Sequence, residues 1–284
     1  MPLMRCPETM DNPSNRGFTL VELIVVIAIT GIVAAAVAVF IRRPVEGYAD
    51  AARRAGLTDE ADTALRRMTR DLRLALPNSV RVDGTGQFVE YIETTGGGRY
   101  RAETGTGGSG NNILDFTTAD TAFDVLGPVP TLATGNQIVV YNLYNTGTVS
   151  NAYSGGNRAA LTSIATPPIA IASTLFPEPS PAKRFHVVSG PVTYGCVGGQ
   201  LLRYSGYAYN TAQVAPPAGA TTTAVLAEHV DTTSANKCQF VYTTGALSER
   251  IATVSIILPI VSTSAGGNVE PVRMFQQTQV SNAP

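Results

Sequence analysis

One carboxylate, that of Glu22, interrupts an apolar segment near the N-terminus. The segment runs from Phe18 to Ile41, FTLVELIVVIAITGIVAAAVAVFI, and Glu22 is its only charged residue. An ionised side chain in a membrane helix costs on the order of 3 kcal/mol at the bilayer centre and less near an interface. The residues three and four positions from Glu22 are uncharged. The cation that can reach this carboxylate is the free α-amine that forms if the chain is cut before Phe18.

The other side chains that could take part in catalysis or bind a metal do not form a known catalytic pattern. The Gly-rich run 96–110 lacks the Gly-Lys-Ser/Thr ending of a phosphate-binding loop and is interpreted as a loop. His186 and His229 show no metal-binding spacing and are interpreted as strand residues. The acidic residues 115, 120 and 124 lack calcium-loop spacing, although a loop-bound calcium ion remains an alternative. We therefore predict no enzymatic activity, no cofactor and no metal site.

The apolar segment is long enough to cross a membrane as a helix. Its residues would rise about 36 Å, against a hydrocarbon core of about 30 Å. The hydrophobic region of a signal peptide is shorter and ends at a small-residue cleavage site, whereas this segment continues into Arg42 and Arg43. We expect a transmembrane helix at residues 18–41.

Residues 42–77 continue this helix with an amphipathic pattern, and Pro77 is expected to end it. Apolar residues recur at spacings of three and four, which indicates one buried face. This stripe consists of Leu57, Ala61, Ala64, Leu65, Met68, Leu72 and Leu76. Arginines fall largely on the other faces, at positions 66, 67, 70 and 73.

The remainder, residues 78–284, has the pattern of a β-rich head with Gly-, Ser- and Thr-rich loops at 94–111 and 145–157. A helix followed by strands favours the α+β class over a parallel doubly wound sheet. The strands are expected at 87–93, 112–116, 137–144, 183–188, 200–204, 224–230, 238–243, 250–257 and 269–276.

Composition excludes some classes of protein. The chain has 284 residues, 44% of them hydrophobic, and a formal net charge of -1, so it can bury a substantial core. The near-zero charge lacks the excess of Lys and Arg that marks a dedicated nucleic-acid binder, so nucleic acid is an unlikely partner.

The residues Arg16 to Glu22, RGFTLVE, resemble the prepilin cleavage and methylation motif. The resemblance implies that a prepilin peptidase cuts between Gly17 and Phe18, and that the same enzyme methylates the new amine of Phe18. It also implies that Glu22 pairs with the Phe18 amine of a neighbouring subunit. The fold implied is pilin-like, a long helix with a membrane half and an amphipathic half packed on a mainly antiparallel β head.

The resemblance makes residues 1–17 a leader peptide, and translation starting at Met10 is an alternative that gives a shorter leader. Cys6 would then be absent from the mature chain, which leaves Cys196 and Cys238 as a pair. We expect these two to form a structural disulfide. Metal or redox roles are less favoured, because the sequence has no C-x-x-C motif and two histidines.

The resemblance implies a minor pilin or pseudopilin that assembles through its N-terminal helix, in the initiation or tip complex of a type IV pilus-type filament. Residues 59–80 resemble large minor pilins and J-type pseudopilins of type II secretion, and residues 185–204 resemble the MshO type of the MSHA pilus. A tip-located adhesin or DNA-binding module is the alternative. The expected partners are other major and minor pilins, an inner-membrane platform protein and an assembly ATPase. The expected location is the bacterial inner membrane, single-pass with a periplasmic head, and then the filament.

Overall fold

The computed structural model describes residues 17–105, 111–147, 149–165, 167–245, 248–263 and 269–284. The expected leader up to residue 16, including Met10 and Cys6, lies outside the described residues. The chain divides into two compact units, with the boundary between Ala52 and Arg53.

The first described element is a single helix, α1 (Leu20–Arg73), which contains both the apolar and the amphipathic segment. The apolar residues 20–41 are exposed, and the helix is long and apolar enough to cross a membrane by length and composition. Pro44 lies inside α1, although its ring nitrogen cannot donate to the helical hydrogen-bond ladder.

The predicted buried stripe is confirmed from Ala61 to Leu72, whereas Leu57 is half-buried and Leu76 is buried beyond the end of α1. Ala61, Met68 and Leu72 have 0% exposed surface, whereas Arg66 and Arg67 are exposed. The alternation follows from the helical repeat, which places residues three and four apart on one face.

The helix ends at Arg73, before the proline expected to stop it, because the next residues pair with a strand instead. The Leu76 N–H donates to the Ile92 carbonyl at 2.8 Å, and the Thr94 N–H donates to the Leu74 carbonyl at 3.1 Å. Pro77 therefore follows a turn that tertiary hydrogen bonds have already fixed.

The residues after α1 form a β head in which every described strand pair is antiparallel. The described strands are β1 (Arg81–Val82), β2 (Phe88–Tyr100), β3 (Asp120–Phe123), β4 (Val125–Leu126), β5 (Gln137–Val140), β6 (Arg158–Ala160), β7 (Ile169–Thr174), β8 (Arg184–Val197), β9 (Gln200–Ser205), β10 (Thr222–Ala227), β11 (Gln239–Gly245), β12 (Ser248–Thr263) and β13 (Val269–Ser281). This arrangement confirms the predicted α+β class.

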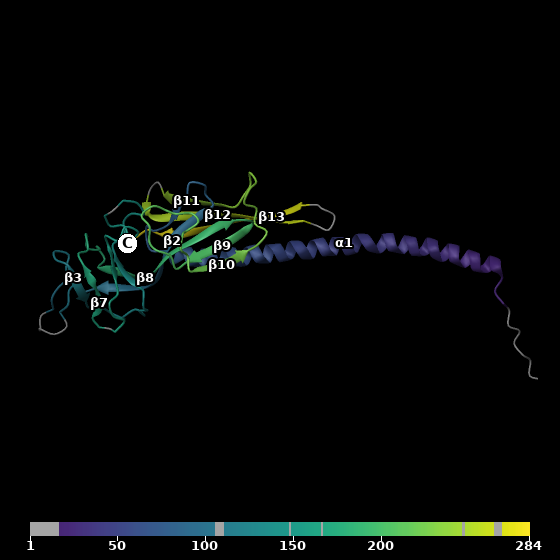
Figure 1. Cartoon of the computed structure of the whole chain (residues 1–284). Helices are drawn as coiled ribbons and strands as arrows, with labels where there is room; N and C mark the ends of the chain where they lie inside the picture. Colours follow the sequence, from purple (N-terminus) through teal and green to yellow (C-terminus); the bar gives the residue numbers. More distant parts are fainter. Residues whose placement is uncertain (1–16, 106–110, 148, 166, 246–247, 264–268) are drawn as a thin grey trace, which may run out of the picture. The chain divides into compact units, whose positions relative to one another are not determined.

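The strands form three sheets (Figure 1). The largest has eight strands along the path β1-β2-β8-β5-β6, with β4 paired to β2, β9 paired to β8, and β10 paired to β9. A second sheet has the order β11-β12-β13, and β3 pairs with β7 in a third. Strand β8 is central, because it pairs with β2, β5 and β9.

Some expectations for strands and loops were wrong. Residues 112–116 form no strand, and the expected loop at 94–111 begins instead with strand, because β2 continues to Tyr100. The Gly-rich part of β2 passes very close to β8. A Cβ atom added at Gly97 would lie 2.8 Å from the Phe185 carbonyl oxygen, so glycine permits a strand pairing that larger residues would block.

The main core surrounds the buried stripe of α1. Leu65, Met68 and Leu72 belong to one cluster with Tyr91 and Tyr194 of the eight-stranded sheet and with Val254, Ile256 and Leu258 of the three-stranded sheet. Burying a side chain of this size stabilises the fold by about 1.5 to 3 kcal/mol. A second core, which includes Phe123, Ile138 and Phe185, lies under β3, β5, β7 and β8.

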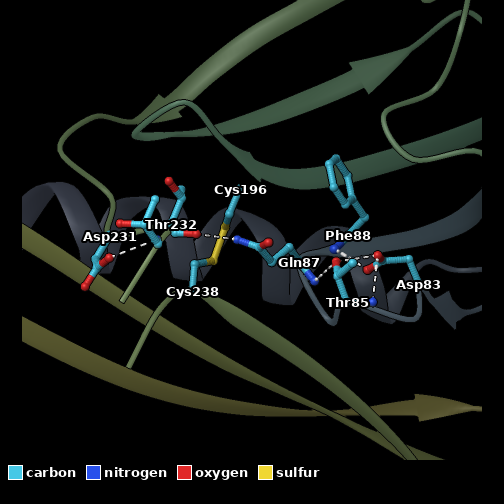
Figure 2. The surroundings of a disulfide bond; sticks show 9 residues. Asp83, Thr85, Gln87, Phe88, Cys196, Asp231, Thr232 and Cys238 are labelled. Atoms are coloured by element: carbon cyan, nitrogen blue, oxygen red, sulfur yellow. Dashed lines mark hydrogen bonds between the residues drawn. A yellow bond between two sulfur atoms is a disulfide. The ribbon is translucent and has the colours of Figure 1, made fainter. Parts of the chain in front are cut away.

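The predicted cysteine pair, Cys196 and Cys238, forms a disulfide with Cα atoms 6.3 Å apart. Cys196 lies in β8, and Cys238 directly precedes β11, so the bond connects the eight-stranded and three-stranded sheets. The Cys196 N–H donates to the Gln87 carbonyl at 3.0 Å, and the Cys238 N–H donates to the Asp231 carbonyl at 2.8 Å. Figure 2 shows the bond with Gln87 reaching the Thr232 carbonyl beside it.

Replacing both cysteines by alanine should lower the free energy of unfolding by about 4 kcal/mol on the chain-entropy account, because the bond joins residues 42 positions apart. Urea unfolding of the detergent-solubilised chain measures this. The chain has no Trp, so near-UV circular dichroism of its 11 tyrosines is the signal. Reductant should lower the stability of the wild type to that of the variant and leave the variant unchanged. A variant as stable as the oxidised wild type would contradict the prediction.

Candidate functional site

The residues that precede α1 are exposed and not helical. Gly17, Phe18 and Thr19 have no regular secondary structure, and the Phe18 side chain is 79% exposed. A peptidase needs an accessible bond whose backbone is not held in a helix. The peptide bond between Gly17 and Phe18 meets both conditions.

Thr19 caps the N-terminus of α1. Its hydroxyl oxygen accepts a hydrogen bond from the Glu22 N–H at 3.3 Å, and its carbonyl accepts one from the Leu23 N–H at 3.2 Å. Thr19 and Glu22 have the T-x-x-E spacing of a capping box, a signal that our sequence prediction missed. Glu22 therefore lies in the first turn, where a carboxylate interacts favourably with the positive end of the helix dipole.

The Glu22 carboxylate is exposed and has no ion-pair partner among the described residues. The next cation along the helix is Arg42, which lies about 30 Å away at 1.5 Å per residue. The described part of the chain therefore places no cation near this carboxylate.

The opposite end of α1 is fixed by a polar network in the head. The Tyr194 hydroxyl donates to Asp71 Oδ2 at 2.6 Å, and the Arg203 guanidinium lies 3.5 Å from the same oxygen. Arg203 also contacts Glu93 at 3.0 Å. Burial, together with the hydrogen bond to Asp71, raises the pKa of Tyr194 well above its usual value, so this tyrosine stays neutral. The network joins α1 to β2, β8 and β9.

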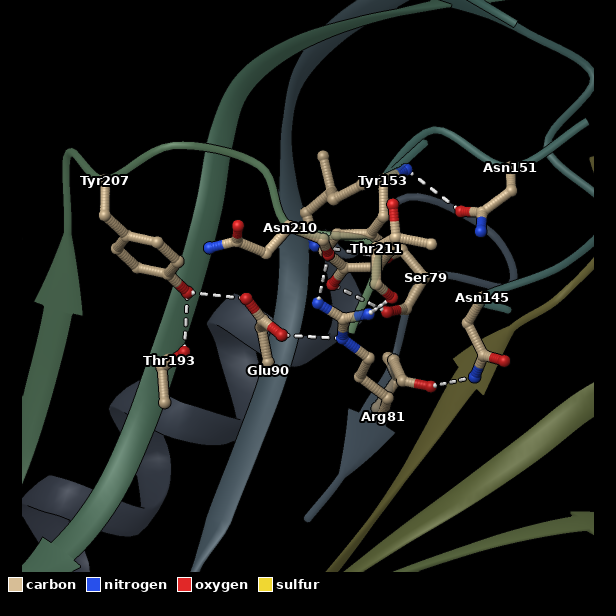
Figure 3. Close-up of polar contacts among 12 residues, drawn as sticks. Ser79, Arg81, Glu90, Asn145, Asn151, Tyr153, Thr193, Tyr207, Asn210 and Thr211 are labelled. Carbon is tan, nitrogen blue, oxygen red and sulfur yellow. Dashed lines mark hydrogen bonds and ion pairs between the residues drawn. The ribbon is translucent and has the colours of Figure 1, made fainter. Parts of the chain in front are cut away.

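A second ion pair, between Arg81 and Glu90, is almost fully buried (Figure 3). Arg81 Nε donates to Glu90 Oε2 at 2.6 Å, and the other guanidinium nitrogens donate to the carbonyls of Asn210 and Thr211. The Tyr207 hydroxyl donates to Glu90 Oε1 at 3.0 Å. Burial raises the pKa of Glu90, and Arg81 opposes that rise.

The same guanidinium lies 3.7 Å from the centre of the Tyr153 ring, which is a cation–π contact. Figure 3 shows Arg81 enclosed between Tyr153 and the segment with Asn210 and Thr211. Every group of the pair has a protein partner, so this arrangement holds residues 207–211 against β1 and β2 rather than offering a free acid or base.

The acidic positions considered for calcium do not converge. Asp115 accepts hydrogen bonds from Thr117 and Thr118, which lower its pKa to about 2. Asp124 pairs instead with Arg101 at 3.4 Å. Among the described residues, no group of three metal-ligating side chains is present.

The two histidines lie in different settings. His186 is a residue of β8, as expected, whereas His229 lies beyond the end of β10 with a φ of 55°, so the expectation of a strand was wrong there. Burial is the main cause that lowers the pKa of His186 to about 4, and the charge of Arg184 adds to it. His186 is therefore neutral at pH 7.

The class of protein follows from the fold. A long apolar N-terminal helix followed by a mostly antiparallel β head is an α+β, pilin-like arrangement. Residues 12–38 match the family model described as the prokaryotic N-terminal methylation motif. This match includes Gly17, Phe18 and Glu22 and supports a type IV pilin-like protein. No curated protein and no solved structure matches the chain.

The motif carries further implications. It implies processing by a prepilin peptidase and assembly with other pilins. Proteins with this motif are structural pilins rather than enzymes. Together with the apolar helix, the motif is consistent with membrane anchoring and a place in a pilus filament.

Replacing Glu90 by glutamine should lower the free energy of unfolding by about 3 to 5 kcal/mol, because Arg81 would stay buried without a counter-charge. Asp62→Asn is the matched control. It breaks the exposed pair between Asp62 and Arg66, and such a pair contributes about 1 kcal/mol or less. Urea unfolding compares the two variants. Equal losses would show that the buried pair has no special role.

The free energy of unfolding should fall as the pH drops from about 6.5 to about 4, by up to about 3 kcal/mol from His186. The unfolded chain binds a proton on this histidine near pH 6.5, whereas the folded chain binds it only near the lowered pKa of about 4. The variant His186→Gln lacks this contribution, so the difference between the two pH profiles isolates it. If the pH profiles of the wild type and the variant are parallel, His186 does not cause the loss of stability at low pH.

Proposed function

We propose that the protein is a minor pilin or pseudopilin that is cut after Gly17, methylated on Phe18 and assembled through α1 into a type IV pilus-type filament. The observation that carries this proposal is the matched motif at residues 12–38, together with an exposed Gly17–Phe18 bond and a Glu22 carboxylate that has no ion-pair partner in the part of the chain that the structure describes. The size of the β head favours a minor component in the initiation or tip complex. The MshO type and the J-type pseudopilin are the two subfamilies proposed.

Cleavage would supply the charge that Glu22 lacks. Hydrolysis of the Gly17–Phe18 bond produces an α-amine, which is mostly protonated at neutral pH because its usual pKa is about 7.7 to 8.0. Methylation leaves a secondary amine that still carries a positive charge when protonated. The amine of one subunit and the Glu22 carboxylate of another would then neutralise each other in the apolar layer, where an unpaired charge is costly.

This pairing would also set the position of neighbouring subunits. Glu22 lies four residues after Phe18, about 6 Å along a helix at 1.5 Å per residue. A contact between the amine of one subunit and Glu22 of the next therefore fixes an axial offset between their helices. The proposed partners in this process are the prepilin peptidase, other pilins, an inner-membrane platform protein and an assembly ATPase.

The disulfide supports a head on the periplasmic side of the membrane. Disulfides such as Cys196–Cys238 persist in the bacterial periplasm and are rare in the cytosol. We therefore propose a single-pass inner-membrane protein with a periplasmic head that later enters the filament.

Mass spectrometry of the assembled protein should find Phe18 at the N-terminus with a mass increase of one methyl group. The variant Gly17→Val should retain the leader, whereas Gly31→Val should be processed normally. Neither glycine has an atom within 4 Å of an added Cβ, so a difference between them reflects peptidase recognition rather than a clash within the chain. An intact Gly17–Phe18 bond in assembled wild-type protein would refute the proposal.

Replacing Glu22 by glutamine should reduce incorporation into sheared filaments by about tenfold or more while leaving cleavage and membrane insertion intact. Glutamine can still take the capping-box position, so this variant tests the charge alone. Glu46→Gln is the matched control on the same helix, because Glu46 already pairs with Arg42 at 2.7 Å. Immunoblots of the filament and membrane fractions measure incorporation. Normal incorporation of the Glu22→Gln protein would exclude the assembly role of this carboxylate.

A further inference from the structure

Strand β13 forms an open edge of the three-stranded sheet. It pairs with β12 along its whole length, and no other described strand pairs with it. The Asn282 N–H donates to the Arg250 carbonyl at 2.8 Å, which sets the alternation of the ladder. Even-numbered residues direct their main-chain groups to β12, so odd-numbered residues such as Phe275, Gln277 and Gln279 direct theirs to the open side.

The two halves of this edge differ in how well they are protected against pairing with another strand. The first half contains Pro271 and Arg273, a proline and a charge that discourage the addition of another strand. The second half, Phe275 to Ser281, has the sequence FQQTQVS, with no proline and no charge. Its register with β12 is unbroken, and the Phe275 side chain is 63% exposed. This half can accept a further strand.

The part of α1 after Arg53 runs alongside β13 in the same direction. Arg54 pairs with Glu270, and Arg73 Nε donates to Thr278 Oγ1 at 3.4 Å. Between these two contacts the helix rises about 28 Å and the strand about 27 Å, so the two elements advance together. Interpolation places Arg66 beside Phe275. The segment from Arg66 to Arg73 therefore flanks the unprotected half of the edge.

A groove of about 570 Å³ separates this segment of α1 from β13. It is lined by Leu65 and Thr69, by the arginines at positions 66, 70 and 73, and by Gln276 of the strand. A second hollow of about 470 Å³ continues from Arg73 along Thr278. The groove thus has guanidinium groups on one wall and Gln276 of the edge strand on the other, and the second hollow adds Gln277 and Gln279 of the same strand.

The charge of this groove is positive. The side chains of Arg66 and Arg70 are 79% and 73% exposed. Asp62, the acidic residue in the lining, pairs with Arg66 at 2.6 Å. Asp71 lies 3.6 Å from Arg70 but also contacts Arg203 and Tyr194 in the head. The arginines therefore exceed the carboxylates that face them.

We propose that this groove binds an extended acidic segment of another protein chain, which adds as a strand to the edge from Phe275 to Ser281. The backbone of β13 would supply the hydrogen bonds, and the arginines at 66, 70 and 73 would select carboxylates. These arginines span about 10 Å of the helix, and residues two apart on a strand are about 7 Å apart, so two acids at alternate positions of the added strand fall within the length that the three arginines cover. The β13 edge of a second copy is a poorer occupant, because FQQTQVS contains no carboxylate.

The test uses the full chain in detergent micelles and a fluorescein-labelled nine-residue peptide in which glutamate alternates with threonine and valine. Fluorescence anisotropy should show binding at least about tenfold tighter than that of the same peptide with glutamine in place of glutamate. Arg66→Glu combined with Arg70→Glu should weaken binding by about tenfold or more. Arg67→Glu, on the same helix but outside the groove lining, should have less than about a twofold effect. The proposal would be overturned if the acidic peptide does not bind, or if Arg67→Glu weakens its binding as much as the double variant at Arg66 and Arg70 does.

Two further peptides distinguish strand addition from a purely electrostatic contact. Both keep the glutamates. One is N-methylated at the odd-numbered residues and the other at the even-numbered residues. One methylation pattern blocks the amides that face β13, and the other blocks those that face solvent. Binding should be lost with one pattern and retained with the other. If the two N-methylated peptides bind equally well, and a nine-nucleotide thymidine DNA binds as tightly as the acidic peptide, the contact depends on charge alone and the proposal is overturned. The site does not involve Gly17, Phe18 or Glu22, so these results do not depend on the proposed function.

Discussion

The burial of one stripe of α1 between two sheets is the contact on which the β head depends. Leu65, Met68 and Leu72 pack against Tyr91 and Tyr194 on one side and against residues of β12 on the other. Without the helix, the inner faces of both sheets would expose large apolar side chains to water. The disulfide between Cys196 and Cys238 connects the same two sheets within this cluster, so it reinforces the packing that the helix creates.

Polar networks then fix how the helix and the loops meet this core. Asp71 links the end of α1 to Tyr194 and Arg203, while the pair of Arg81 and Glu90 holds the segment after β9 against β1 and β2. Buried charges of this kind tolerate little change, because removing one partner leaves the other without compensation in a low-dielectric interior. Burial raises the pKa of Tyr194 and of Glu90, and both side chains are held by partners in the head. Their pKa values alone would have suggested a site of catalysis, and their saturated contacts argue against it.

The N-terminal segment, unlike the head, is shaped by local contacts rather than by packing in a core. Thr19 caps the helix, and Glu22 combines a favourable place in the first turn with an unfavourable place in an apolar segment. Both residues lie within the matched N-terminal methylation motif at residues 12–38, and the role proposed for this combination is assembly with other subunits. In α1 a single helix therefore contains both this segment and the stripe that organises the head.

The sequence by itself determined the features that depend on local pattern. The apolar segment and the motif could be recognised from apolar length and from one carboxylate within it, and the stripe from Ala61 to Leu72 from the spacing of three and four. The cysteine count pointed to the pair 196 and 238.

Tertiary structure decided what depends on distant partners. Helix α1 ends at Arg73 because the residues after it bond to β2, and the Gly-rich run begins as strand because Gly97 allows β8 to approach. The groove between α1 and β13 exists because Arg54 meets Glu270 and Arg73 meets Thr278, contacts between residues about 200 positions apart. No local pattern encodes such pairings, since their geometry arises only when the sheets close around the helix.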